Sequence, residues 1–179
     1  VETMGGRHNH PEIKYTNVRV PKTNLLGERG GGHKLGQVRL GPARLAHCMR
    51  WLGQIELALE MLVDRAQNRF AHGSYLSEKQ SIQWMMADSA MELYASKLMV
   101  LHAAYKIEKG EDFRQEVSMA KHHVANTLWR VVDRAMQVHG ALGYSTDTPL
   151  AEMMQQARWA RLADGADEVH QMRIAELLM

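Results

Sequence analysis

Three long stretches of helical periodicity constrain this fold more than any other feature of the sequence. Apolar residues recur at spacings of three and four over residues 45–66, 82–100 and 117–138, the pattern of a helix that buries one face. At 1.5 Å per residue, helices of about 28–35 residues span about 42–52 Å, and short connections make such neighbours antiparallel. We therefore predict an all-α fold: an up-and-down four-helix-type bundle of long antiparallel helices, with a short N-terminal extended or β-like arm.

Capping residues predict where these helices begin and end. Ser77, with Gln80 three residues later, has the pattern of a capping box before the second helix. Thr148 followed by Pro149 predicts an N-cap and a proline in the first helical position. Gly41-Pro42 should kink the first helix or delay its regular part. The three stripes end near glycines, namely Gly73, Gly110 and Gly140. The expected helices run over about 35–69, 78–110, 112–140, 149–162 and 166–178.

The first 32 residues differ from the rest of the chain. Residues 13–21 form a short, partly alternating, β-prone segment with too few neighbours for an independent sheet. We expect residues 1–32 to be the remnant of a β-domain with its linker, and residues 33–179 to be a C-terminal helical bundle domain. On this interpretation the chain is a fragment of a longer protein.

Composition excludes several classes of protein and site. No apolar run reaches the ~18–20 residues of a membrane span, so none is expected. The net charge of +2 is spread along the helices, which argues against a nucleic-acid partner. The single cysteine, Cys48, excludes an internal disulfide and fits a reducing compartment. The pairs His8/His10 and His122/His123 lack the cysteine or carboxylate cluster that would complete a tetrahedral set, so no metal site is predicted.

Two short motifs are candidate ligand-facing turns. Asp164-Gly165 places a carboxylate directly before a glycine, at the break between two helical patterns, where it can project into a cleft. Gln137-Val138-His139-Gly140 ends the third helix in a turn, where bare backbone can approach a bulky ligand. From the residues alone, plain turns remain open: Asp164 as a cap of the last helix, and Gln137 with Gly140 as a helix end.

Taken together and in order, several motifs resemble the C-terminal domain of the acyl-CoA dehydrogenase flavoenzymes. Residues 18–28 look like the family's link from its β-domain into its helical bundle. The other matches are Arg44 on the first helix, Arg69 with Gly73 and Gln80, the turn Gln137-Val138-His139-Gly140, and the corner Asp164-Gly165. The run Arg161-Leu162-Ala163-Asp164-Gly165 is most similar to a subgroup whose eukaryotic members carry a kinase-like domain upstream.

The resemblance implies non-covalently bound FAD, an acyl-CoA thioester substrate, a dimer or a tetramer of two dimers, and an electron acceptor such as an electron-transfer flavoprotein. It implies a cytoplasmic location in a bacterium and an organelle matrix in a eukaryote. It places Asp164 as the base that removes the α-proton. The implied substrate contacts are Arg44, Gly41 and Gly165. The implied cofactor contacts, some of them on a neighbouring subunit's flavin, are Arg69, His72, Gln80, Gln137, Gly140, Ala141, Ala166 and Glu168.

This sequence departs from the family pattern at the very positions that matter for chemistry. Asp164 stands where the family has a glutamate, one methylene longer, and Ala43 leaves no carboxylate at the alternative base position on the first helix. Ala141 replaces a glycine, His72 an aromatic that packs on the flavin, and Ala166 a hydroxyl residue. Two alternatives stay open: a non-catalytic helical oligomerisation or interaction module, and an acyl-CoA oxidase-like flavoenzyme. Acyl chain length and branching are not specified.

Overall fold

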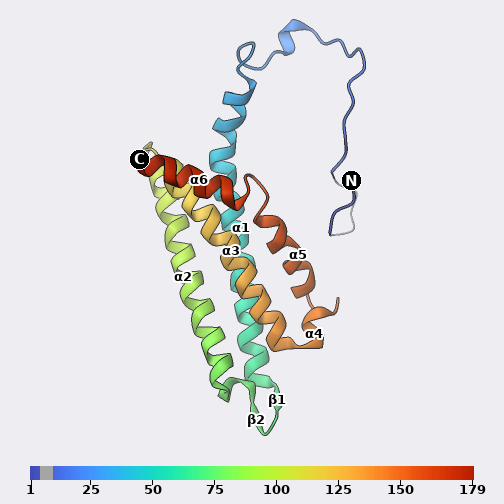
Figure 1. Ribbon diagram of the computed structural model, residues 1–179, viewed down its shortest axis with the longest axis vertical. Coiled ribbons are helices and arrows are strands. Elements are labelled where there is room, and N and C mark those ends of the chain that lie inside the picture. The colour runs from blue at the N-terminus through green and yellow to red at the C-terminus, as the bar shows by residue number, and fades with distance from the viewer. Residues whose placement is uncertain (5–9) are drawn as a thin grey trace.

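Three long antiparallel helices form the body of the molecule, which confirms the predicted all-α bundle (Figure 1). The computed structural model describes residues 1–4 and 10–179. The long helices are α1 (Gly32–Asn68), α2 (Gln80–Lys109) and α3 (Arg114–His139). α1 runs unbroken through Pro42, so the expected delay of its regular part is wrong. Proline removes one backbone donor, and a helix of 37 residues tolerates that loss near its start.

Backbone hydrogen bonds explain where α2 ends and α3 begins. Gly110 is left-handed, with φ 70°, and its N–H donates to the carbonyls of Lys106 and Ile107. The N–H of Glu111 also donates to Lys106, which completes the glycine-based motif that closes many helices. Asp112 Oδ1 then accepts the backbone N–H of Arg114 at 3.1 Å, at the first turn of α3. The turn predicted at Gly110 is confirmed.

A small antiparallel hairpin, which the sequence interpretation did not anticipate, follows α1. Strands β1 (Phe70–Ala71) and β2 (Ser74–Tyr75) pair with Phe70 opposite Tyr75. The two residues between them, His72 and Gly73, both have positive φ, 52° and 82°, as a two-residue hairpin turn requires. Because the hairpin leads into the 3-10 turn η2 (Leu76–Glu78), Ser77 lies inside that turn, α2 has no side-chain cap, and the predicted capping box is wrong.

Three shorter helices complete the domain: α4 (Ala141–Tyr144), α5 (Leu150–Ala160) and α6 (Asp167–Leu178). α5 packs against α3 as the fourth member of the bundle, and α6 crosses its upper end (Figure 1). Pro149 occupies the N-cap of α5 with no side-chain cap, so the N-cap predicted at Thr148 is off by one residue. The Thr148 hydroxyl instead donates to the Leu142 carbonyl.

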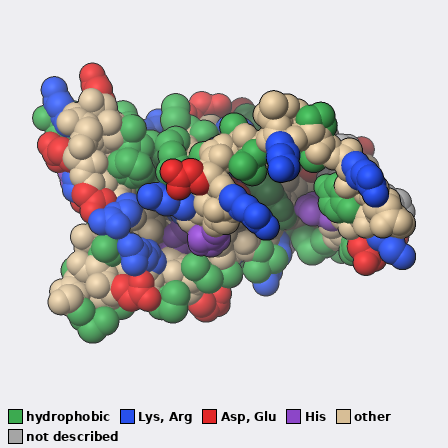
Figure 2. Space-filling view, turned by 90° about the horizontal axis from the view of Figure 1, so that it is seen from above, with side chains coloured by type: hydrophobic (Ala, Val, Ile, Leu, Met, Phe, Trp, Pro, Cys, Tyr) green, Lys and Arg blue, Asp and Glu red, His purple; other side chains and the backbone are tan. Residues whose placement is uncertain are grey.

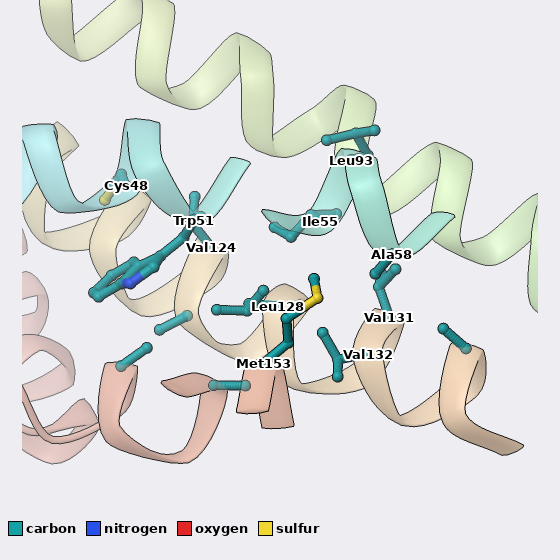
Figure 3. Close-up of a cluster of buried hydrophobic side chains, with 14 of the residues drawn as sticks. Cys48, Trp51, Ile55, Ala58, Leu93, Val124, Leu128, Val131, Val132 and Met153 are labelled. Atoms are coloured by element: carbon teal, nitrogen blue, oxygen red, sulfur yellow. The ribbon is translucent and has the colours of Figure 1, made fainter. Parts of the chain in front are cut away.

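α3 is the central helix, and the core forms around it. It contacts α1, α2, α4, α5 and α6. Figure 3 shows the interleaving of core side chains from α1, α2, α3 and α5. The labelled residues there are Cys48, Trp51, Ile55, Ala58, Leu93, Val124, Leu128, Val131, Val132 and Met153, all buried.

The N-terminal arm extends away from the bundle (Figure 1). Residues 10–31 contain the short 3-10 turn η1 (Lys22–Asn24) and no paired strand, as expected for an extended arm. His8 lies outside the described residues, and no cluster of potential metal ligands is found among the residues described. None of the described helices is long and apolar enough to cross a membrane.

Candidate active site

The corner between α5 and α6 is built on two residues in unusual backbone conformations. Asp164 has φ +52° and Gly165 has φ +113°. A side chain on Gly165 would meet the ring of the buried His170, because a Cβ there would lie 2.9 Å from Nε2. Non-glycine residues adopt positive φ at a cost of about 1–2 kcal/mol, and such strain is concentrated at functional sites. The strained turn aims the Asp164 side chain toward α1.

Two basic side chains from other helices hold the carbonyls of this corner. Arg44 of α1 donates from Nε to the Asp164 carbonyl oxygen at 2.8 Å. Lys121 of α3 is fully buried and donates from Nζ to the Gly165 carbonyl oxygen at 2.6 Å. Burial lowers the pKa of Lys121, and the nearby Asp167, Cys48 and Asp164 oppose that shift. The corner is therefore fixed from both sides.

Asp167, at the first turn of α6, anchors the corner through hydrogen bonds to side chains of the α5–α6 turn and of α3. Its Oδ2 accepts hydrogen bonds from Arg161 Nε at 2.7 Å and from Asn126 Nδ2 at 3.1 Å. His122 Nδ1 lies 3.6 Å from its Oδ1. Burial alone would raise the pKa of Asp167, but the donors from Arg161 and Asn126 outweigh it and hold that pKa below its ordinary value. Asp167 therefore has a structural role, as the buried anion of the corner.

The Asp164 carboxylate is partly accessible. Its side chain is 21% exposed, and its Oδ2 lies 3.2 Å from Nε2 of His47 on α1. The end of the bundle that carries α6 is seen from above in Figure 2, with histidine side chains near its centre and lysine or arginine side chains beside them. A partly accessible carboxylate of this kind is a candidate for proton transfer.

The predicted cofactor residues fall at both ends of the bundle. Five of them meet in one hollow of about 420 Å³ beside the hairpin: Arg69, His72, Gln137, Gly140 and Ala141. Arg65 also lines it, and its Nε is buried without a hydrogen-bond partner. Gln80 is exposed at the start of α2 and does not line the hollow. Ala166 and Glu168 lie at the opposite end, at the N-cap and in the first turn of α6.

The predicted substrate residues are at the Asp164 end. Arg44 and Gly165 are within the corner, as described above. Gly41 is half-buried, and a Cβ there would lie 3.0 Å from the Phe113 ring, so it allows a close approach of α1 to the start of α3. The structure therefore assigns Gly41 a packing role. Its separate role toward a substrate stays a prediction.

Sequence interpretation missed Lys121, Asp167, His47 and His170. One signal was available for Lys121, because it shares the apolar helix face that carries Val117, Val124 and Leu128, and a lysine on such a face needs a buried partner. No comparable signal marked the others. Asp164, which His47 faces, and Asn126, which donates to Asp167, lie far from these residues in the sequence. On α2, Met85, Met86 and Met99 pack against the core, whereas Met91 is exposed.

Comparison with known proteins gives a consistent result. Residues 30–179 match the family described as acyl-CoA dehydrogenase, C-terminal domain. The chain is 47% identical over 171 residues to the probable acyl-CoA dehydrogenase FadE2 of Mycobacterium tuberculosis (strain ATCC 25618 / H37Rv), covering 94% of this chain and 42% of the relative. It is 41% identical over 172 residues to the probable acyl-CoA dehydrogenase IBR3 of Arabidopsis thaliana, covering 95% and 21%.

A solved structure agrees with these sequence relatives. The butyryl-CoA dehydrogenase of Megasphaera elsdenii superposes with a TM-score of 0.87 at 32% identity, over 92% of this chain and 43% of that chain. The present chain thus spans less than half the length of each of these relatives.

Proposed function

This chain belongs to the acyl-CoA dehydrogenase family and forms its C-terminal helical domain, and from that premise we propose that Asp164 is the base that removes the α-proton of an acyl-CoA thioester. One observation carries the proposal. Asp164 is an accessible carboxylate held at positive φ in a corner whose two carbonyls are tied to Arg44 and Lys121. A plain helix cap needs neither the strain nor the two cations, one of them buried, that bind the corner's carbonyls.

The chemistry sets requirements for this corner. The α-proton of a thioester is too weakly acidic for an unaided carboxylate, so the thioester carbonyl must be polarised by hydrogen bonds. The backbone N–H of Asp164 is our candidate donor, as the family resemblance suggests. The carboxylate would then take the proton. The chemistry that FAD would supply when bound is acceptance of the hydride from the β-carbon. The reaction is the α,β-dehydrogenation of an acyl-CoA.

The hollow at the other end of the bundle fits part of the FAD. The partnerless Nε of Arg65 and the guanidinium of Arg69 offer positive charge for phosphate groups. Gly140, with φ 65°, leaves bare backbone beside them, and a side chain there would meet nothing within 4 Å. We propose that Arg69, Gln137 and Gly140 hold the pyrophosphate and adenosine parts of a neighbouring subunit's flavin. His72, at the hairpin tip, and Ala141 complete that wall, while Gln80, Ala166 and Glu168 are proposed contacts outside the hollow.

An apolar stripe on α2 supports self-association. Its exposed members recur at spacings of three, four and seven: Trp84, Met91, Tyr94, Leu98, Leu101 and Tyr105. A continuous apolar strip of this length on one helix favours burial against another chain. We propose a dimer or tetramer of the intact enzyme, in which residues 1–32 are the end of a β-domain and its linker, and residues 33–179 are the bundle.

The test is Asp164→Asn in the full-length protein, because asparagine keeps the size of the side chain and removes its basicity. The variant should bind thioesters nearly as well as the wild type and should fail to bleach its flavin. A variant that reduces its flavin at a near-normal rate would show that another residue is the base. Reoxidation of the reduced flavin by oxygen or by an electron-transfer flavoprotein then separates an oxidase from a dehydrogenase.

A further inference from the structure

His47 faces the Asp164 carboxylate from α1, one helical turn after Arg44. Its Nε2 lies 3.2 Å from Asp164 Oδ2. The ring N–H is not aligned for a hydrogen bond at that distance, and Oδ2 is buried without a hydrogen-bond partner. A small rotation of the Asp164 side chain would bring the two groups into line, and hydrogen bonds at catalytic groups often tighten only when the ligand binds.

Arg50 determines which ring nitrogen of His47 carries the proton. Its Nη2 lies 2.7 Å from His47 Nδ1. Because a guanidinium can only donate, Nδ1 must offer its lone pair, which leaves the single ring proton on Nε2, facing Asp164. Burial holds the pKa of His47 below its ordinary value; Asp164 opposes that shift, while Arg50, Arg39 and Lys121 add to it. The ring is therefore a neutral donor.

Two tryptophans restrict how the ring can turn. Trp51 stacks on His47 with ring centroids 5.5 Å apart at an interplanar angle of 30°. Trp159 of α5 meets the same ring edge-on, at 5.6 Å and 65°. Trp51 is itself buried, so it cannot move aside without disturbing the core. The Nε2–H is thus held in one direction by packing on both sides.

We propose that His47 is a positioning residue for Asp164, whose Nε2–H engages Oδ2 and leaves Oδ1 to take the α-proton. The inference rests on the proposed role of Asp164 as the base. In the step, the α-carbon–hydrogen bond breaks, an oxygen–hydrogen bond forms at Oδ1, and the C–H electron pair stays with the substrate; His47 keeps its own proton throughout. An aspartate is one methylene shorter than a glutamate, so its carboxylate can reach the substrate in fewer orientations. A donor of fixed direction, the Nε2–H of His47, holds the carboxylate in one of those orientations.

The kinetic test compares two variants of the full-length, FAD-loaded protein. His47→Gln keeps an N–H donor at nearly the reach of Nε2, whereas His47→Leu removes it. Flavin reduction is followed by stopped flow with the straight-chain acyl-CoA that reduces the wild type fastest. Losing a hydrogen bond to a charged group should slow H47L by about 10–100-fold, with thioester affinity nearly unchanged, while H47Q stays within several-fold of the wild type.

Three outcomes would count against the inference, and they separate it from the proposed function. H47L reducing its flavin at the wild-type rate, beside an inactive D164N, would overturn the role of His47 and leave the base in place. H47L and H47Q being equally slow would reduce His47 to a packing residue. An active D164N would remove the base, and with it the group that His47 positions.

A second measurement needs neither flavin nor turnover and uses the 179-residue chain. Two-bond ¹H–¹⁵N spectra of the histidine rings should show His47 protonated at Nε2 and not at Nδ1 near neutral pH. Asp164→Asn should shift the Nε2 resonances of His47 and leave those of the exposed His33 unchanged. A proton on Nδ1, or a His47 ring that does not respond to the substitution, would overturn the proposal.

Discussion

Replacing Gly165 with alanine should destabilise the fold by about 2–6 kcal/mol. The cost has two sources. A residue with a side chain at φ +113° costs roughly 1–3 kcal/mol in backbone strain. The new Cβ would also lie 2.9 Å from His170 Nε2, and forcing an extra methyl group into a packed site costs typically ~1–3 kcal/mol.

The backbone cannot relax cheaply to relieve this strain. A change in the dihedral angles of residue 165 would turn the carbonyls on either side of it. Those carbonyls accept hydrogen bonds from Arg44 at 2.8 Å and from the buried Lys121 at 2.6 Å. Leaving either donor unpaired costs about 1–3 kcal/mol. The backbone therefore keeps its strained conformation and the two hydrogen bonds stay intact.

The assay is urea unfolding of the 179-residue chain followed by circular dichroism, with a thermal melt beside it. The midpoint of the melt should fall by about 4–24 °C for a domain of this size. Gly53→Ala is the matched control, because Gly53 lies within α1 and a Cβ there meets nothing within 4 Å. That variant should gain about 0.5–1 kcal/mol from helix propensity. A Gly165→Ala protein as stable as the wild type would refute the strained, tied corner.

Three further outcomes are expected. Burial lowers the pKa of His170 to about 4, so the unfolded state binds a proton at a higher pH than the folded state does. The free energy of unfolding should therefore fall by on the order of 3 kcal/mol as the pH drops from 6.5 to 4. Urea titrations of the wild type and of His170→Gln across that range check this, and an equal dependence of the unfolding free energy on pH in the two proteins would contradict it. Burial raises the pKa of the Cys48 thiol to about 12, so a disulfide thiol reagent should label it only in urea, and rapid labelling of the native protein would count against a closed core. Because the proposed β-domain is represented by residues 1–32 alone, the chain should lose added FAD on dialysis, and a stoichiometric yellow protein would show that the bundle holds the flavin by itself.

The helices could be predicted from the sequence, and the short elements between them could not. A stripe of about 20 residues averages over many side chains, so its period survives single local exceptions. The hairpin after α1 depends on two residues that both take positive φ, and histidine at the first of them is not a strong signal of such a turn. The capping pattern at Ser77 and Gln80 failed for the same reason, because the hairpin sets where α2 can begin.

Part of the candidate site could likewise be predicted from the sequence, and part of it could not. The Asp164-Gly165 corner and the residues of the hollow were found through their resemblance to a known family, since each is a short motif with a local signature. The groups that hold the corner have no such signature. Lys121 is 44 residues from the carbonyl that it binds, and Arg44 is 120 residues from its own. Only the packing of α1 and α3 against the α5–α6 corner brings these charges together.

α3 fixes the relation between the two ends of the molecule. Lys121 lies beside the Asp164 corner and Gln137 beside the hollow, and 16 residues of continuous helix between them correspond to about 24 Å. α3 is packed by every other α-helix of the described chain, so that distance does not change without disturbing the core. The corner proposed for proton transfer and the hollow proposed for phosphate groups lie at opposite ends of one rigid helix, an arrangement suited to contact two different ligands, or one ligand in each of two subunits. This separation is the physical reason why we assign the hollow to a neighbour's flavin and the corner to this chain's own substrate.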